Sequence, residues 1–92
     1  MIRMRKLTDY GIVILAHFAR HDLKMQHTAR SVSEATQLPQ PTVSKLLKLL
    51  TRREFLISQR GSSGGYSLAV APEAVTVAAI VEALEGPIGV TE

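Results

Sequence analysis

The chain has 92 residues, enough for one small domain with a modest core and room for one functional site. It contains no cysteine, which excludes a disulfide scaffold and a thiolate metal site within these residues. The formal net charge is +3 and the sequence pI is near 9.7. The longest uninterrupted apolar run, Ile12 to Ala16, is far shorter than the roughly 20 residues that span a bilayer, so we predict no membrane segment.

The chain begins with a basic arm, residues 1 to 6, that leads into a core helix. Thr8–Asp9 suits a helix start, and no proline interrupts the chain from there to about Arg20. Apolar side chains repeat at helical spacing along this stretch: Ile14, Leu15 and Phe18. Ile12 and Val13 add apolar surface on other sides, and we therefore expect another element to cover this helix.

Two histidines near the end of this helix, His17 and His21, are spaced i, i+4, an arrangement that can clamp zinc. No third ligand stands out nearby in the sequence. We therefore predict no metal site and interpret the two histidines as polar residues near a helix end. The following connector runs to His27, with a short strand expected at Lys24 to Gln26.

A helix-turn-helix is predicted in the middle of the chain. Thr28 suits the cap of a short first helix, with Val32 and Ala35 apolar and Leu38 in the turn. Pro41 suits the first position of the second helix, because its missing N–H would have no partner there. Apolar residues then recur at i, i+3, i+4 and i+7 and predict one buried stripe: Val43, Leu46, Leu47 and Leu50. Two short helices joined by a tight turn are typical of this motif.

The opposite side of the second helix is polar and basic. It carries Thr42, Ser44, Lys45, Lys48 and Arg52. Short hydroxyls near the helix start can reach base edges, and cations deeper in the helix can contact phosphates. Residues 39 to 66 hold five cations against one glutamate, whereas residues 67 to 92 hold four glutamates and no cation. This one-sided charge is expected of a nucleic-acid binder; without the helix-turn-helix, an ordinary solvated face would be the better interpretation.

A β-hairpin is predicted after Glu54, which closes the second helix. Residues 55 to 60 and 66 to 70 suit two strands, and the glycine-rich residues 61 to 65 suit the turn. A glycine-rich loop can also cradle phosphate, but here a strand rather than a helix follows. A hairpin in this place is a wing, and its Arg60 can follow the DNA backbone or enter a narrow minor groove. The fold class is therefore mainly α with a small β-hairpin, a winged helix-turn-helix DNA-binding domain.

The last predicted element is a helix from Thr76, as its cap, to Glu85, with Gly86–Pro87 as its stop. Its apolar stripe consists of Val77, Ile80, Val81 and Leu84. We expect this helix to pack on the first one. One core should join all the elements, with Ile14, Phe18, Val32, Leu46, Leu50, Leu56 and Ile80 as its members.

Four stretches together resemble the IscR-like winged helix-turn-helix transcription regulators, and most closely the members that control iron-sulfur cluster assembly operons of the Suf type. They are Leu7 to Tyr10, Leu38 to Leu47, the Arg-Gly-Ser-Ser-Gly-Gly-Tyr run at 60–66, and Ala83 to Ile88. The resemblance covers nearly the whole chain, and the wing run is its most specific part. It implies a bacterial, cytoplasmic homodimer, a repressor or activator, that binds a pseudo-palindromic operator in double-stranded DNA.

The resemblance also assigns residues. Thr42, Ser44 and Lys45 match recognition-helix positions that face the groove, and Arg60 matches the wing arginine. The full set expected at the DNA is Arg5, Lys6, Thr28, Pro41, Thr42, Ser44, Lys45, Lys48, Arg52, Arg60, Ser62, Ser63 and Gly64. Ser44 stands where some members carry a glutamate that selects among DNA motifs, which leaves the preferred operator open.

A second departure concerns the cofactor, because the sequence stops where the family's cysteines would begin. We expect a winged-helix domain at 1–86 and, at 87–92, the start of a linker toward a sensor loop and a C-terminal dimerisation helix. The chain is then a fragment of a longer protein or a natural form without the sensor. No cofactor is expected in these 92 residues; an iron-sulfur cluster is implied only for a longer, cysteine-containing parent.

The sequence is also compatible with other functions. A winged helix can serve as a protein-protein interaction module, and members of the same family sense nitric oxide or cysteine status. An enzyme fits least, because no paired carboxylates, nucleophile with base, or metal cluster can be assembled from the sequence. The prediction is therefore a sequence-specific DNA-binding regulator of iron-sulfur cluster biogenesis genes.

Overall fold

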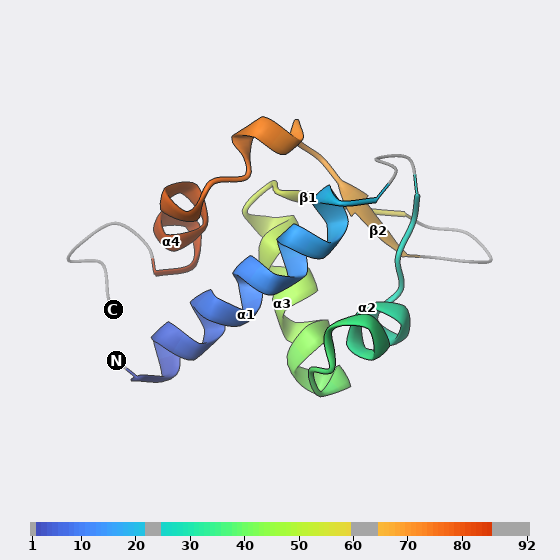
Figure 1. Ribbon diagram of the computed structural model, residues 1–92, viewed down its shortest axis with the longest axis horizontal. Coiled ribbons are helices and arrows are strands. Elements are labelled where there is room, and N and C mark those ends of the chain that lie inside the picture. The colour runs from blue at the N-terminus through green and yellow to red at the C-terminus, as the bar shows by residue number, and fades with distance from the viewer. Residues whose placement is uncertain (1, 22–24, 60–64, 86–92) are drawn as a thin grey trace.

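Four α-helices and a two-stranded hairpin make up the fold (Figure 1). The computed structural model describes residues 2–21, 25–59 and 65–85. The elements in chain order are α1 (Ile2–Ala19), α2 (Ala29–Thr36), α3 (Gln40–Arg52), β1 (Leu56–Ser58), β2 (Tyr66–Leu68), the 3-10 turn η1 (Pro72–Ala74) and α4 (Val77–Glu85). In Figure 1, α1 lies between α4 and α2, and it contacts both of them as well as α3. The predicted fold class is thus confirmed.

One hydrophobic core joins these elements, and all seven residues predicted for it are buried. Its members are Ile14, Leu15, Phe18, Val32, Val43, Leu46, Leu47, Leu50, Phe55, Leu56 and Ile80. The four residues of the predicted α3 stripe are all 0% exposed. Full burial of an aliphatic side chain is worth about 1.5–3 kcal/mol, so this stripe fixes α3 firmly on the domain.

Helix α1 begins at Ile2, so the prediction of a basic arm followed by a helix start at Thr8 was wrong. The first residues are good helix formers, and neither proline nor glycine precedes Gly11, so nothing stops the helix from extending backwards. Thr8 is buried within α1, and its hydroxyl donates a hydrogen bond to Oε2 of Glu85 at 2.9 Å. The threonine therefore joins two helices instead of capping one.

Thr28 caps α2 as predicted. Its hydroxyl oxygen accepts the N–H of Ser31 at 3.0 Å, and its own N–H donates to the Ser31 hydroxyl, also at 3.0 Å. Helix α3 starts at Gln40, one residue earlier than predicted, and Pro41 occupies its second position. A proline is tolerated there because the N–H groups of the whole first turn lack helical partners.

The hairpin pairs Leu56 with Leu68, Ile57 with Ser67 and Ser58 with Tyr66. Both strands are shorter than predicted, and residues 60–64 lie outside the described residues. The expected strand at 24–26 is wrong where it can be compared, because Met25 and Gln26 are not in a strand. Pairing begins one residue later, at His27, whose side chain is buried and whose backbone pairs with Tyr66.

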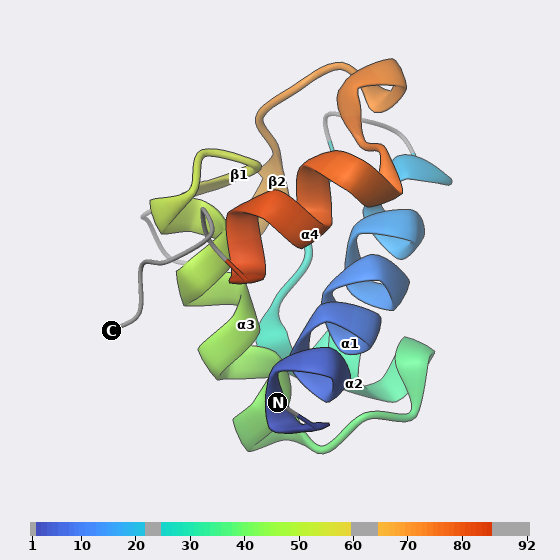
Figure 2. The ribbon, with the colours of Figure 1, turned by 90° about the vertical axis from the view of Figure 1, so that its left-hand side faces the viewer.

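Helix α4 packs on α1, as expected (Figure 2). Thr76 caps it, since the N–H of Ala79 donates to its hydroxyl at 3.1 Å. The helices approach closely at Gly11, where an added Cβ would come within 2.5 Å of Leu84 Cδ1, so a larger residue there would displace the end of the Leu84 side chain. The predicted α4 stripe is wrong at Val77, which is 59% exposed, because in the described part of the chain α4 has mainly α1 and α3 to pack against.

No described helix is both long enough and apolar enough to cross a bilayer.

Candidate nucleic-acid interface

The exposed side of α3 carries the residues that the sequence assigned to DNA. Lys45, Lys48 and Arg52 are exposed, whereas Thr42 and Ser44 near the helix start are half-buried. The three exposed cations stand opposite the fully buried stripe, so the core fixes which face of α3 points outward. With Pro41, the structure thus brings six of the predicted residues together on one helix.

A surface depression of about 240 Å³ lies among the three cations of α3, with Leu49 as its apolar lining residue. The spacing from Lys45 through Lys48 to Arg52 places the charges along one helix face. No acidic residue occurs within α3 to neutralise them. Such a row attracts the phosphates of a nucleic-acid backbone.

Three further predicted residues lie outside the row of cations that Lys45, Lys48 and Arg52 form on α3. Pro41 is exposed in the first turn of α3, and Lys6 is exposed in α1. Thr28 is exposed, and its hydroxyl oxygen accepts a hydrogen bond in the cap of α2, which is the structural role that the sequence also predicts for it. The side chain of Arg5 lies outside what the structure describes.

The wing residues Arg60, Ser62, Ser63 and Gly64 also lie outside the described residues, so their assignment stays a prediction. The base of the wing is nevertheless fixed to α3, because the N–H of Phe55 donates to the carbonyl of Leu50 at 2.9 Å. Gly65, the residue directly before β2, has a φ of 118°, and an added Cβ would lie 3.2 Å from the carbonyl oxygen of His27. Only glycine suits this position.

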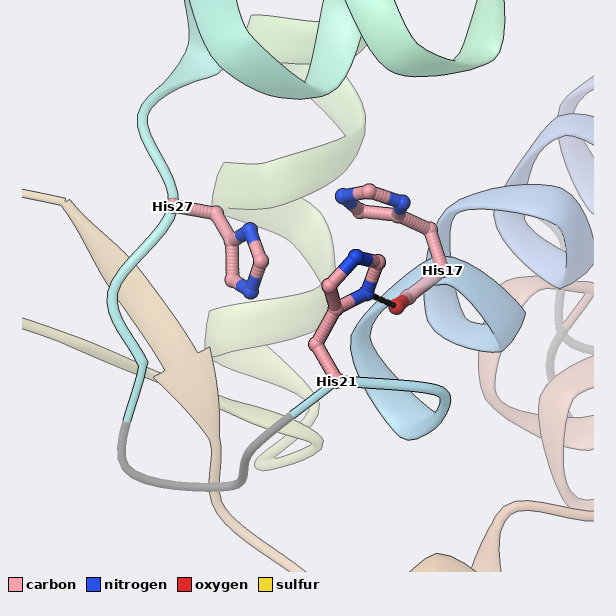
Figure 3. A group of neighbouring side chains, drawn as sticks. All are labelled: His17, His21 and His27. Carbon is pink, nitrogen blue, oxygen red and sulfur yellow. Dashed lines mark hydrogen bonds between the residues drawn. The ribbon is translucent and has the colours of Figure 1, made fainter.

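Sequence reasoning missed a group of three histidines. His17 and His21 are joined by His27, and ligand nitrogens of all three lie within 4.8 Å of one another (Figure 3). The ring centroids are 4.4 Å apart for His17 and His21, 5.0 Å for His17 and His27, and 5.4 Å for His21 and His27. The i, i+4 pair was visible in the sequence, but only the return of the chain to β2 brings His27 to it.

Two of these histidines have altered proton affinities. Burial is the main cause that lowers the pKa of His17 below its usual value, and the charges of His21, His27 and Arg20 lower it further. Burial also lowers the pKa of His27, with a smaller contribution from His21. Both imidazoles therefore favour the neutral form, which is the form that binds metal ions.

Comparison with known protein families gives one match that covers almost the whole chain. The profile of the Rrf2 family, described as iron-dependent transcriptional regulators, matches residues 4–92. Among curated relatives, the HTH-type transcriptional regulator CymR of Bacillus subtilis is 30% identical over 83 residues, covering 90% of this chain and 60% of CymR. NsrR of Oceanobacillus iheyensis is 24% identical over 84 residues, covering 91% of this chain and 57% of NsrR.

Solved structures agree with these sequence matches. The structure of B. subtilis CymR, the global cysteine regulator of that organism, superposes with a TM-score of 0.79 at 29% identity, covering 94% of this chain and 67% of CymR. IscR of T. potens gives a TM-score of 0.79 at 28% identity, covering 94% of this chain and 63% of IscR. The chain spans about 60% of the length of the curated relatives it matches.

The matched family is described as iron-dependent. Iron-sulfur clusters are held mainly by cysteine thiolates, and this chain has no cysteine. The three clustered histidines supply only imidazole nitrogens. The residues present therefore do not fit an iron-sulfur cluster.

Proposed function

Because the chain belongs to the Rrf2 family of transcriptional regulators, we propose that it is the sequence-specific DNA-reading part of a regulator of iron-sulfur cluster assembly genes. The observation that carries this proposal is the division of α3 into two faces. One face is fully buried, and the other exposes Lys45, Lys48 and Arg52. A helix held in this way can enter a major groove as a rigid element, with its cations at the phosphates.

A winged helix that serves only to bind another protein has no need for this row of cations. Three cations around one depression, with no acidic residue within α3, raise the cost of burying the face against a neutral protein partner. The same arrangement favours a polyanion. DNA is therefore the preferred partner.

The proposed regulator binds as a homodimer to a pseudo-palindromic operator and acts in the cytoplasm as a repressor or activator. One recognition helix contacts few bases, and two helices on half-sites one helical turn apart multiply the specificity. We place the DNA-reading domain at residues 1–86 and the start of a linker at 87–92 on the sequence alone, because residues 86–92 lie outside the described residues. No iron-sulfur cluster is proposed for these residues, because they include no thiolate ligand; a cluster is implied by the family resemblance only for a longer, cysteine-containing parent.

Genes that respond to cysteine status are the second candidate target. This alternative rests on the similarity to CymR, which is a cysteine regulator in its own organism. The two candidates differ only in the operator and the genes beside it, so a binding experiment on genomic DNA distinguishes them.

The test has two stages. The 92-residue chain is first applied to mixed duplex DNA at low salt and released by a salt gradient; salt-dependent retention is expected, and its absence would favour the protein-protein module. Fragments of genomic DNA retained at higher salt are then sequenced. Enrichment beside iron-sulfur assembly genes supports the first target, whereas enrichment beside cysteine genes would replace it with the second.

A further inference from the structure

The three histidines form a group whose geometry is not explained by DNA binding. His17 comes from the last turn of α1, His21 from the residues just after that helix, and His27 from the segment that pairs with β2. Figure 3 shows the two ring nitrogens of His27 on the edge that faces the other two rings. Three imidazoles from three backbone positions thus converge on one space.

One nitrogen in this group is buried without a partner. His27 is 5% exposed, and its Nε2 has no hydrogen-bond partner within the described part of the chain. A buried polar atom left unpaired costs free energy, and such atoms are uncommon in folded proteins. A metal ion is one ligand that would satisfy this nitrogen.

The hydrogen bond made by His21 prepares a second ligand. Its Nδ1 lies 2.6 Å from the backbone carbonyl oxygen of His17. A carbonyl oxygen can only accept, so in the neutral form of the ring Nδ1 carries the proton and Nε2 has the lone pair. Metal-ligating histidines almost always donate their other ring N–H to such an acceptor, which fixes the tautomer and orients the ring.

Aromatic packing around Phe18 accounts for only part of the arrangement of the three histidines. The ring of Phe18 meets His27 at a centroid distance of 4.6 Å and His17 at 6.1 Å, both in edge-to-face orientations. These contacts account for the burial of two rings. They do not account for the place of His21 or for the direction of the nitrogen atoms.

We propose that His17, His21 and His27 bind a divalent transition metal ion of the zinc class. Three imidazoles leave the fourth position of a tetrahedral site for water. Zinc-nitrogen bonds of about 2.0–2.1 Å place tetrahedral ligand nitrogens about 3.3 Å apart, so the group must contract from its present spread of up to 4.8 Å. His21, which follows the end of α1 and is the least buried of the three histidines, is the ligand that we expect to make most of this movement, by pivoting about its hydrogen bond to the His17 carbonyl.

Metal binding at this site links the end of α1 to the base of the wing. The N–H of His27 donates to the carbonyl of Tyr66 at 2.8 Å, and the N–H of Tyr66 donates back at 2.8 Å. An ion held between His17, His21 and His27 therefore ties α1 to the strand that leads out of the wing. Both amides of this bridge should exchange their hydrogens more slowly when the ion is bound.

The test uses the 92-residue chain without a histidine tag, freed of metal by a chelator and titrated calorimetrically with Zn²⁺. We expect one ion per chain and at least a tenfold loss of affinity in His21→Ala, which leaves both buried histidines in place. Gln26→Ala, exposed and next to His27, is the matched control and should bind as the unchanged chain does. His27→Gln should abolish binding; if it fails to fold, His21→Ala decides.

Two further measurements identify the ligands. Co²⁺ in place of Zn²⁺ should give the intense visible absorption of a four-coordinate site, and nitrogen NMR of the imidazoles should show all three rings shifting together. Binding of less than one ion per chain, affinity unchanged in His21→Ala, or NMR shifts that spare the imidazoles would overturn the proposal.

Discussion

The hydroxyl of Thr8 donates a hydrogen bond to Oε2 of Glu85 and so joins the first helix of the chain to the end of the last one. The two residues are far apart in the sequence, and their contact closes the packing of α1 on α4. Thr8 is 4% exposed, whereas Glu85 is exposed. The carboxylate therefore contributes to the fold while it keeps contact with water.

Replacing Thr8 by valine keeps the shape of the side chain and removes this hydrogen bond. The expected loss of unfolding free energy is about 0.5–1.5 kcal/mol. In a Glu85→Ala background the same replacement should cost less, and the difference between the two costs measures the coupling of the pair. Urea unfolding of the four proteins supplies these values. Glu82→Ala, an exposed change on the same helix, is the control; equal costs in both backgrounds would deny the coupling.

Shortening Leu46 should destabilise the domain strongly, because its side chain is 0% exposed at the centre of the core. Leu46→Ala is expected to cost about 2–5 kcal/mol, a large share of the roughly 5–15 kcal/mol that stabilises a small protein. Leu49→Ala, on the half-buried side of the same helix, should cost clearly less. Denaturation midpoints compare the two, and an unchanged midpoint for Leu46→Ala would contradict the anchoring role of the stripe.

Local signals in the sequence predicted most of the helical structure. The i, i+3, i+4, i+7 spacing from Val43 to Leu50 identified the buried face of α3, and Thr28 identified the start of α2. Both features depend on residues within one or two turns of each other. The exposed cations of α3 follow from the same periodicity, because burial of one face leaves the other outside.

Features that depend on distant parts of the chain were predicted less well. Thr8 is a residue type that often caps helices, but here it lies within α1 and its hydroxyl donates a hydrogen bond to Glu85 of α4. A local pattern cannot predict this contact, because α4 is at the other end of the sequence. His27 lies beside His17 because its backbone pairs with that of Tyr66, and no local sequence pattern predicts this pairing. Val77 fits a helical stripe, yet the periodicity cannot say how wide a surface the neighbouring helices offer.

The cations and the hydroxyls of α3 should affect DNA binding in different ways. Lys48 is exposed and placed for a phosphate, so Lys48→Ala should weaken binding to all sequences about equally. It should also lower the slope of log affinity against log salt by roughly one. Arg20→Ala removes the same charge from an exposed site outside α3 and should leave the slope nearly unchanged.

Ser44, near the start of α3, should instead influence which sequence is preferred. A contact to a base edge carries about 1–3 kcal/mol of discrimination, so Ser44→Ala should relax selection at one position of the operator. Selection from a randomised duplex pool measures this preference. If Ser44→Ala weakened binding to all sequences equally while Lys48→Ala changed the preferred site, Lys48 would be the residue that contacts a base and Ser44 the one that contacts a phosphate.

The stability of the metal-free domain should fall as the pH drops below the usual imidazole pKa of 6.5. Burial lowers the pKa of His17 and of His27 in the folded protein, so below pH 6.5 the unfolded chain takes up protons that the folded chain does not. The contribution of the two neutral imidazoles to the free energy of unfolding is therefore complete above pH 6.5 and is lost as the pH falls toward the lowered pKa values of His17 and His27. Aspartate and glutamate titrate mainly below about pH 4.5, so a comparison between about pH 7.5 and 5.5 isolates the histidines.

Urea unfolding with a chelator present, at several pH values in this window, measures the effect. His27→Gln removes one of the two shifted groups, so its stability should vary less steeply with pH even if its stability at neutral pH is lower. The charge of Arg20 also repels the protonated form of His17, so raising the salt concentration should weaken part of the pH dependence but leave the part caused by burial. Stability that stayed constant as the pH fell through 6.5 would show that folding does not lower the pKa values of the two rings, and stability that rose would show that folding raises them; either result would contradict the shifts caused by burial.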